Sequence, residues 1–486
     1  MLLMKYYKLL LPALFLYSCG HVPRALWKNF PSVRDLKPEI LMPAASDPGY
    51  FEMETQSFPP ATNWIWRPGK KLPYSSEDAF CKSGTDAFLV IKEDSIIHEY
   101  YGKNTDRLTR FNTHSIAKAI VSTLTGIALQ QGHVRSLSQP IVDILPELKG
   151  RVSEDLLIGD LLQMTSGLNF SENYLNPYSS VTSMYYSSHT ENWIKKIRQK
   201  YAPGSRFAYH SSNTWLLVRV LERATGQSLS EYASAYLWHP LGVPVAAGWK
   251  TDRQGDGNIL GFTGFNTTAT GLARIGQLMV KGGVWQGNRL LPESWTEALY
   301  RADTIRGAVP FYQRAWYPNS YYQDYFAEGL FYQYLYCHPA TGTVIVRIGD
   351  GGSGSYDWRM SFRVLAGIQE KPTHKMIEME EISRLSGIFM FQERSDGDTM
   401  LLGRKIKITG TNEFLKVKVL NDSDSVRVRT KGYVTDKKFR LYQDSSGYFY
   451  EPKTMRTLVF ASDGTSLKWK RQEFEWYLTR VMPSDK

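Results

Sequence analysis

The sequence has few cysteines, no internal repeat and no recognisable metal-binding motif. Three cysteines among 486 residues allow one disulfide at most. The histidines are scattered, without H-E-x-x-H spacing or paired cysteines, so they are expected to be solvated or core residues rather than metal ligands. Lysine and arginine are mixed with aspartate and glutamate, without a long basic block. The formal charge of +11 therefore indicates a solvated surface and no nucleic-acid partner.

What the chain does contain is typical of a well-packed globular protein. Hydrophobic residues make up 42% and aromatic residues 13% of the sequence, which includes 30 tyrosines. The length predicts about two to three domains rather than a single core. One of these domains is large enough to be an enzyme.

The first residues predict export. Lys5 and Lys8 precede the apolar run Leu9–Leu16, which is too short to span a bilayer, so residues 1–18 are interpreted as a signal peptide. The run ends in a small residue and Cys19, a pattern that resembles the lipobox of bacterial lipoproteins. Cys19 is therefore the expected lipidation site, and the protein is expected in the bacterial periplasm or cell envelope, held by a lipid anchor. Ordinary secretion is the alternative.

Two cysteines then remain in the folded part of the chain. Cys81 and Cys337 either pair in an oxidising compartment or stay as two separate buried thiols. Nothing in their spacing decides between these two states.

Residue patterns divide the exported chain into an arm and two domains. Residues 19–75 are rich in proline and aromatics without a sustained period, and we expect an extended arm. Residues 76–370 combine strand and helix patterns, which predicts an α+β domain with helices on an antiparallel sheet. Residues 371–486 alternate apolar and charged residues, which predicts an antiparallel β-barrel or sandwich.

Within the α+β domain a hairpin is expected first, at 86–100, where two β-rich runs flank a charged turn. Strands return at 325–348. Apolar residues with helical spacing predict helices at 114–131, 156–164, 192–199, 214–224, 269–280 and 358–367.

A single S-x-x-K motif, from Ser115 to Lys118, lies at the start of the helix predicted at 114–131. One helical turn brings the hydroxyl and the amine to the same side, so the amine can take the hydroxyl proton if its pKa falls from about 10.4. The helix N-terminus favours negative charge that develops there. The motif alone is weak, because a capping serine beside a surface lysine gives the same letters.

Neighbouring segments carry a more specific signal. The segments F-N-T-H-S-I-A-K at 111–118, D-L-L-Q-M-T-S-G-L at 160–168 and P-G-S-R-F-A-Y-H-S-S-N-T at 203–214 resemble the β-lactamase-related serine hydrolases in content and order. That family includes class C β-lactamases, D-alanyl-D-alanine carboxypeptidases, esterases and nylon-oligomer hydrolases. The resemblance spans about residues 86–367. It implies a β-lactamase/transpeptidase-like fold, Ser115 as the acylated nucleophile and no cofactor.

The resemblance also implies roles for two further residues. The second family motif is Y-x-N or, in the nylon-hydrolase branch, Y-x-S, and Tyr209-His210-Ser211 follows the second form. Tyr209 is then expected either to be partly phenolate or to relay a proton to the leaving group. Ser211 is expected to form a hydrogen bond within the site.

The third family motif, K-T-G, is absent, and so is S-D-N, which means that the class A mechanism does not carry over. The matching strand lies near 325–333, where the nylon-hydrolase branch usually has A-x-G-x-x-G-Q and Tyr332 replaces the second glycine. The backbone amide of Gly329, or of Ala327 if the register is shifted, is expected to form an oxyanion hole with that of Ser115. Tyr332 either narrows the pocket or marks a site without turnover.

The sequence therefore predicts a serine hydrolase that cleaves an ester or amide in a small molecule or a cell-wall peptide. Ser115 attacks the carbonyl, Lys118 and Tyr209 move the proton, and water releases the acyl group. The competing hypothesis is a catalytically inactive, membrane-tethered binding protein that keeps the fold. A third hypothesis makes the C-terminal β domain the functional part, in recognition of glycan or peptide.

Overall fold

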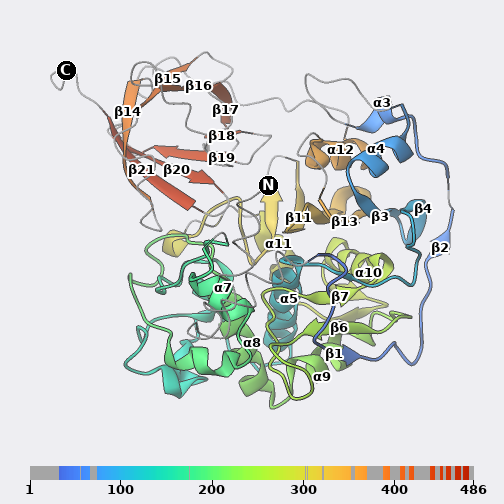
Figure 1. The fold of residues 1–486 in the computed structure, drawn as a ribbon, viewed down its shortest axis with the longest axis horizontal. Coiled ribbons are helices and arrows are strands. Elements are labelled where there is room, and N and C mark those ends of the chain that lie inside the picture. Colours follow the sequence, from blue (N-terminus) through green and yellow to red (C-terminus); the bar gives the residue numbers. More distant parts are fainter. Residues whose placement is uncertain are drawn as a thin grey trace, which may run out of the picture.

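The computed structural model of the protein, shown in Figure 1, describes most of the chain between residues 32 and 368 and eight strands between residues 387 and 480. The gaps in the first part are 55, 66–73, 175, 301–302, 304, 320–321 and 352–355. Within the described residues, no helix combines the length and the apolar character needed to cross a membrane. The predicted signal peptide and Cys19 lie outside the described residues.

A seven-stranded sheet forms the centre of the α+β domain, in the order β10-β11-β12-β13-β3-β4-β2. Neighbouring strands are antiparallel except for the short β2–β4 pair, which an arm segment adds in parallel. The hairpin and the later strands predicted from the sequence are confirmed. The strands are β2 (Glu52–Met53), β3 (Thr85–Lys92), β4 (Ser95–Tyr101), β10 (Tyr317–Asn319), β11 (Asp324–Gly329), β12 (Gln333–His338) and β13 (Thr343–Gly349).

Helices cover this sheet and fill the middle of the chain (Figure 1). They are α3 (Ala61–Trp64), α4 (Ser76–Lys82), α5 (Ile116–Gln130), α6 (Ile158–Leu162), α7 (Ser180–Tyr185), α8 (Ser211–Thr225), α9 (Leu229–Ala233), α10 (Ala269–Val280), α11 (Glu293–Tyr300) and α12 (Trp358–Leu365). The helices predicted at 114–131, 214–224, 269–280 and 358–367 are confirmed, and the one predicted at 156–164 is confirmed in a shorter form.

The helix predicted at 192–199 is a correction. The chain there forms a short 3-10 helix, η3 (Thr190–Lys195), which begins earlier and ends earlier than predicted. The backbone amide and the hydroxyl of Thr190 both donate to the carboxylate of Asp252, at 2.8 and 2.7 Å. A contact with a residue 62 positions away sets the start of this turn, and local spacing cannot reveal it.

Both faces of the seven-stranded sheet are buried, and strand β3 shows how. Its odd-numbered residues from 87 to 91 belong to a hydrophobic cluster with helices α5 and α10. Phe88 and Val90 belong to a second cluster with helix α12. Because neither face meets water, β3 is apolar almost throughout and does not alternate with polar residues.

A second, four-stranded sheet has the order β1-β6-β7-β5, and its last strand, β5, comes directly before helix α5 in the chain. Its strands are β1 (Glu39–Met42), β6 (Ala247–Lys250), β7 (Phe265–Thr267) and β5 (Phe111–Asn112). Strand β1 comes from the predicted arm, so this part of the arm is built into the fold. A short hairpin of β8 (Val284–Trp285) and β9 (Asn288–Arg289) follows α10.

The C-terminal strands close into an antiparallel barrel, which is one of the two forms predicted from the sequence. They are β14 (Gly387–Arg394), β15 (Lys405–Gly410), β16 (Leu415–Leu420), β17 (Lys438–Gln443), β18 (Phe449–Glu451), β19 (Arg456–Phe460), β20 (Ser466–Arg471) and β21 (Phe474–Arg480). The predicted domain boundary at residue 371 lies outside the described residues and stays a prediction.

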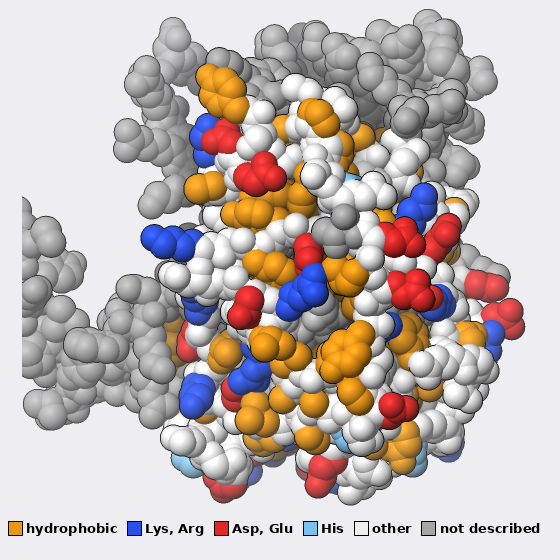
Figure 2. Space-filling view, turned by 90° about the vertical axis from the view of Figure 1, so that its right-hand side faces the viewer, with side chains coloured by type: hydrophobic (Ala, Val, Ile, Leu, Met, Phe, Trp, Pro, Cys, Tyr) orange, Lys and Arg blue, Asp and Glu red, His pale blue; other side chains and the backbone are white. Residues whose placement is uncertain are grey.

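The structure also shows the state of the two cysteines and the distribution of surface charge. Of the two alternatives, the structure shows separate free thiols; Cys337 is buried, whereas Cys81 is exposed, which corrects the expectation of two buried thiols. On the face drawn in Figure 2, basic and acidic side chains are interspersed. This mixture fits a solvated surface better than a basic binding patch.

Candidate active site

The turn before helix α5 holds Ser115 in place. The backbone amide and the hydroxyl of Thr113 both donate to the Phe265 carbonyl of β7, at 3.2 and 2.8 Å. The His114 amide donates to the side chain of Asn112 at 2.9 Å, and His114 has a φ of +49°, a left-handed conformation that is uncommon outside glycine. Ser115 follows as the N-cap residue of α5, at the positive end of the helix dipole.

Lys118 lies one turn later, with only 2% of its surface exposed. Its Nζ lies 3.1 Å from Ser115 Oγ and 2.8 Å from the Phe262 carbonyl oxygen. The same atom lies 4.9 Å from the ring centre of Tyr209. The structure therefore brings together the three residues that the sequence predicts to be catalytic.

Tyr209 is buried directly before helix α8, and the ring of Tyr312 packs edge-on against it at 5.8 Å between ring centres. Burial raises the pKa of Tyr209 well above its usual value, and neighbouring tyrosines and the carboxylate of Glu172 raise it further. A buried tyrosine of this kind is a neutral phenol at neutral pH. Of the two roles expected for Tyr209, this environment favours the proton relay over the phenolate.

Ser211, the first residue of α8, bonds to a carboxylate that the sequence pattern does not reveal. Its hydroxyl and its backbone amide both donate to Glu172, at 2.5 and 2.8 Å. The hydroxyl of Tyr174 donates to the same carboxylate at 2.5 Å. Glu172 and Tyr174 come from a segment without helical or strand periodicity, so no sequence signal pointed to either residue.

Gly329 ends strand β11 against the turn that holds Ser115. A Cβ atom at this position would lie 2.4 Å from the carbonyl oxygen of Thr113, so a larger residue would require the two segments to move apart. This close approach favours Gly329 over Ala327 as the second amide of an oxyanion hole. The oxyanion hole itself stays a prediction.

Tyr332 lies in the tight turn between β11 and β12. It is 39% exposed and has a φ of +63°, which explains why the family pattern has a glycine at this position. Phe331, with a φ of +64°, packs its ring edge-on against His114 at 5.5 Å. The aromatic residue that contacts the nucleophile turn is therefore Phe331, the neighbour of the residue that the sequence singles out.

Comparison with known proteins gives the same assignment as the motifs. The sequence model of the beta-lactamase family matches residues 79–353, which is more than half of the chain. The chain belongs to the beta-lactamase family. The predicted resemblance and fold are thereby confirmed.

The relatives of this family member include hydrolases. A 6-aminohexanoate-dimer hydrolase from Paenarthrobacter ureafaciens is 30% identical over 286 residues, which cover 54% of this chain and 72% of that protein. A solved structure from Bacillus anthracis, named for the same dimer hydrolase, superposes with a TM-score of 0.61 at 19% identity and covers 69% of this chain and 91% of its own. An uncharacterised protein from Alkalihalophilus pseudofirmus is 21% identical over 236 residues, or 43% of this chain and 62% of its own. The prediction of a β-lactamase-related hydrolase is confirmed.

Two buried histidines adjoin the site of this beta-lactamase family member. Burial lowers the pKa of His114 to about 4 and that of His210 to about 4. Both rings are therefore neutral at neutral pH, and neither supplies an acid there. Among the described residues, no group of three or more histidine, cysteine, aspartate or glutamate side chains is arranged to hold a metal ion.

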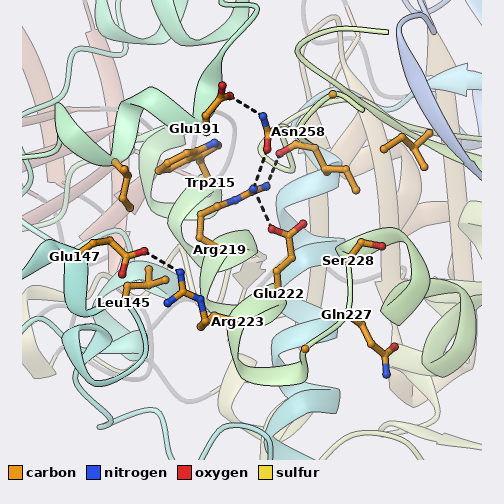
Figure 3. Close-up of a pocket in the computed structure, with 15 residues that line it drawn as sticks. Leu145, Glu147, Glu191, Trp215, Arg219, Glu222, Arg223, Gln227, Ser228 and Asn258 are labelled. Carbon is orange, nitrogen blue, oxygen red and sulfur yellow. Dashed lines mark hydrogen bonds and ion pairs between the residues drawn. The ribbon is translucent and has the colours of Figure 1, made fainter. Parts of the chain in front are cut away.

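A cavity of about 620 Å³ lies along the C-terminal half of α8 (Figure 3). Arg219 projects into it, forms an ion pair with Glu222 at 3.0 Å and donates to the Ile259 carbonyl at 3.1 Å. At its edge Arg223 pairs with Glu147 at 3.1 Å. The cavity contains none of the predicted catalytic residues, and these charged groups bind one another.

Proposed function

We propose that the protein cleaves an ester or amide bond through an acyl-enzyme on Ser115. The observation that carries the proposal is the 3.1 Å approach of Lys118 Nζ to Ser115 Oγ, beside the ring of Tyr209. The similarity to a 6-aminohexanoate-dimer hydrolase favours a small linear amide as the substrate.

Acylation starts from the uncharged amine of Lys118: Ser115 Oγ attacks the carbonyl carbon and passes its proton to Nζ of Lys118. The carbonyl oxygen becomes negative, and the backbone amides of Ser115 and Gly329 stabilise that charge. Tyr209 is protonated, so it gives its proton to the leaving nitrogen or oxygen as the old bond breaks. Lys118 then returns a proton to Tyr209, and the acyl group remains on Ser115.

Deacylation uses water as the nucleophile and Lys118 as the proton carrier. Water attacks the acyl carbon and loses a proton to Lys118, and the two amides again stabilise the oxyanion. The bond to Ser115 Oγ breaks, and Lys118 returns the proton to that oxygen. The acid product leaves, and the three side chains are back in their starting protonation states.

The test is turnover of p-nitrophenyl esters and of the linear 6-aminohexanoate dimer by wild type, Ser115→Ala and Ser122→Ala. Ser122 is a buried control on the same helix, whose hydroxyl donates to the Arg314 carbonyl at 2.6 Å. We expect Ser115→Ala to lose turnover by about 10⁴-fold or more. Ser122→Ala is expected to lose about 1 kcal/mol of stability and to keep turnover.

Two results would contradict the proposal. Wild-type turnover in Ser115→Ala would remove Ser115 as the nucleophile. No turnover of either substrate by folded wild-type protein, together with retained binding of the dimer, would favour the inactive binding protein.

We further propose that the protein is exported and anchored through Cys19. The support is the order of Lys5, Lys8, the short apolar run and Cys19 in the sequence. In a bacterial host we expect wild type in the membrane fraction and Cys19→Ala in the soluble fraction. Both proteins in the soluble fraction would leave ordinary secretion as the better explanation.

A further inference from the structure

We propose that Glu172 is a positioning residue of the active site, which clamps its own loop to the first turn of α8 and thereby holds Tyr209 beside Lys118. This inference rests on the proposed function, because it takes Tyr209 as the proton donor. Nothing in the sequence motifs or in the family match assigns a role to Glu172.

The clamp consists of three hydrogen bonds to one buried carboxylate. Glu172 is 7% exposed. Its Oε1 accepts from the hydroxyls of Ser211 and Tyr174, at 2.5 Å each, and its Oε2 accepts from the Ser211 backbone amide at 2.8 Å. One side chain therefore joins two segments that lie 39 residues apart in the sequence.

Helix α8 depends on this carboxylate for its N-terminal cap. His210, the N-cap residue, forms no capping hydrogen bond with its side chain. Glu172 supplies the missing acceptor from a distant loop, at the end of a 15-residue helix where a negative charge is favourable. Because Tyr209 is only two residues before Ser211, fixing Ser211 also fixes the backbone that carries the phenol.

The charge of Glu172 also acts on Tyr209. The groups that face the phenol are Lys118 from α5, Tyr312 and Tyr317 from the segment at β10, and Tyr174 and Glu172 from the loop. Among those that shift the pKa of Tyr209, Glu172 is the carboxylate, and it raises that pKa. A negative charge at this point keeps the phenol protonated and ready to donate.

The experiment compares Glu172→Gln with Glu222→Gln. Glu172 contacts the first turn of α8, whereas Glu222 belongs to α8 itself, is ion-paired with Arg219 in the C-terminal half of the helix and does not touch the site. Glu172→Gln keeps the shape of the side chain but removes its charge, so the charge-assisted hydrogen bonds from the Ser211 amide and the two hydroxyls are replaced by weaker neutral ones. Ser211→Ala removes the hydroxyl contact, and Ser211→Thr restores it.

The first readout is the rate of labelling by a fluorophosphonate, from about pH 7 to about pH 10. In wild type the alkaline limb set by Tyr209 lies above this range, because burial raises the pKa of Tyr209 well above its usual value. Glu172→Gln is expected to slow labelling by about tenfold and to move that limb down towards pH 10, because removal of the carboxylate lowers the pKa of Tyr209. Ser211→Ala is expected to slow labelling less, and Ser211→Thr is expected to recover it. Glu222→Gln is expected to keep the wild-type rate and profile. A purely structural role would lower the labelled fraction without moving the pH profile.

The second readout is hydrogen–deuterium exchange, which needs no activity. We expect faster exchange of the peptide that contains the Ser211 amide in Glu172→Gln and no change there in Glu222→Gln. Wild-type labelling with an unchanged profile in Glu172→Gln, together with unchanged exchange, would overturn the inference while the proposed function stands. A wild-type chain that is not labelled would remove the proposed function, and unchanged or faster exchange would still decide whether the clamp exists.

Discussion

The two ends of helix α8 each hold a carboxylate, buried at the N-terminal end and partly exposed near the C-terminal end, and they stabilise it in different ways. At the N-terminal end Glu172 accepts hydrogen bonds from two hydroxyls and a backbone amide. Near the C-terminal end, where the helix dipole is unfavourable for an anion, Glu222 forms an ion pair with Arg219. The first arrangement fixes the segment that follows Tyr209, and the second balances a charge within the helix.

The two ends also respond to acid in opposite directions. At the active site, His210 is the N-cap residue of α8 and His114 lies in the turn before α5, and burial lowers the pKa of each to about 4. The cavity end contains Glu222, whose pKa burial raises above its usual value. Acid is therefore expected to destabilise the fold around these two histidines. At the cavity end it is expected to remove the unfavourable charge of Glu222.

The largest expected effect is on the labelling rate, which should depend on the amine at the active site and not on the cation beside the cavity. Lys118→Met removes the amine that takes the proton from Ser115 and keeps an apolar chain of similar length. We expect the labelling rate with a fluorophosphonate to fall by about 10³-fold or more. Arg219→Met removes a cation at the other end of α8 and is expected to leave the labelling rate unchanged. A loss of less than tenfold in Lys118→Met would show that the amine is not the base.

The next effect is acid destabilisation at the site end. The histidine pKa is about 6.5 when unfolded and about 4 in the fold, so the unfolded chain takes up more protons and stability falls as pH drops from about 6.5 towards 4. Each ring is expected to contribute up to about 3 kcal/mol of this loss. His210→Phe, which fills the same space against Phe170, is expected to remove about half of it. Urea unfolding at pH 7 and pH 4 measures the difference; an equal loss in both proteins would contradict this assignment.

At the cavity end, the contribution to stability is expected to change with pH in the opposite direction. The pKa of Glu222 is raised in the fold, so its contribution is most favourable below the unfolded value and is lost as pH rises through the folded value. Arg219→Met should therefore cost about 2 kcal/mol at pH 7 and less at pH 4.5. The double variant Arg219→Met with Glu222→Gln should recover part of the loss at pH 7. Equal costs at both pH values, measured by urea unfolding, would sink this explanation.

The smallest expected effect concerns Tyr332. Tyr332→Gly removes the backbone strain of a tyrosine with a positive φ, but glycine also gives the unfolded chain more conformational entropy. The two effects oppose each other, so the free energy of unfolding should change by no more than about 1 kcal/mol. Labelling should change by less than about threefold, because Phe331 rather than Tyr332 contacts His114. A large gain in labelling would instead show that Tyr332 obstructs the pocket.

The sequence predicted those parts of the molecule that local patterns encode. Helix α10 and the S-x-x-K turn follow from apolar spacing and from one motif, and the structure places Lys118 beside Ser115 as one helical turn requires. The Glu172 clamp could not be predicted in this way, because it joins segments 39 residues apart through a side chain without a periodic context. The 3-10 turn at Thr190 was missed for the same reason, since Asp252 determines where it begins.

The turn at Tyr332 is a second place where the sequence alone could not predict the contacts of the side chains. The missing glycine in the family pattern predicts either a narrower pocket or a site without turnover, and the sequence cannot show which side chain of the turn faces the nucleophile. The structure shows that the turn is built with two consecutive left-handed residues, and that the ring of Phe331 is the one that reaches His114.

The most direct test of the central claim is intact-mass measurement of the full chain after incubation with a fluorophosphonate and, separately, with a penicillin. We predict one adduct in wild type, mapped to Ser115, and none in Ser115→Ala; a penicillin adduct would direct the search for substrates towards cell-wall peptides. Folded wild-type protein that gains no mass with either reagent, or an adduct that persists in Ser115→Ala, would contradict the account.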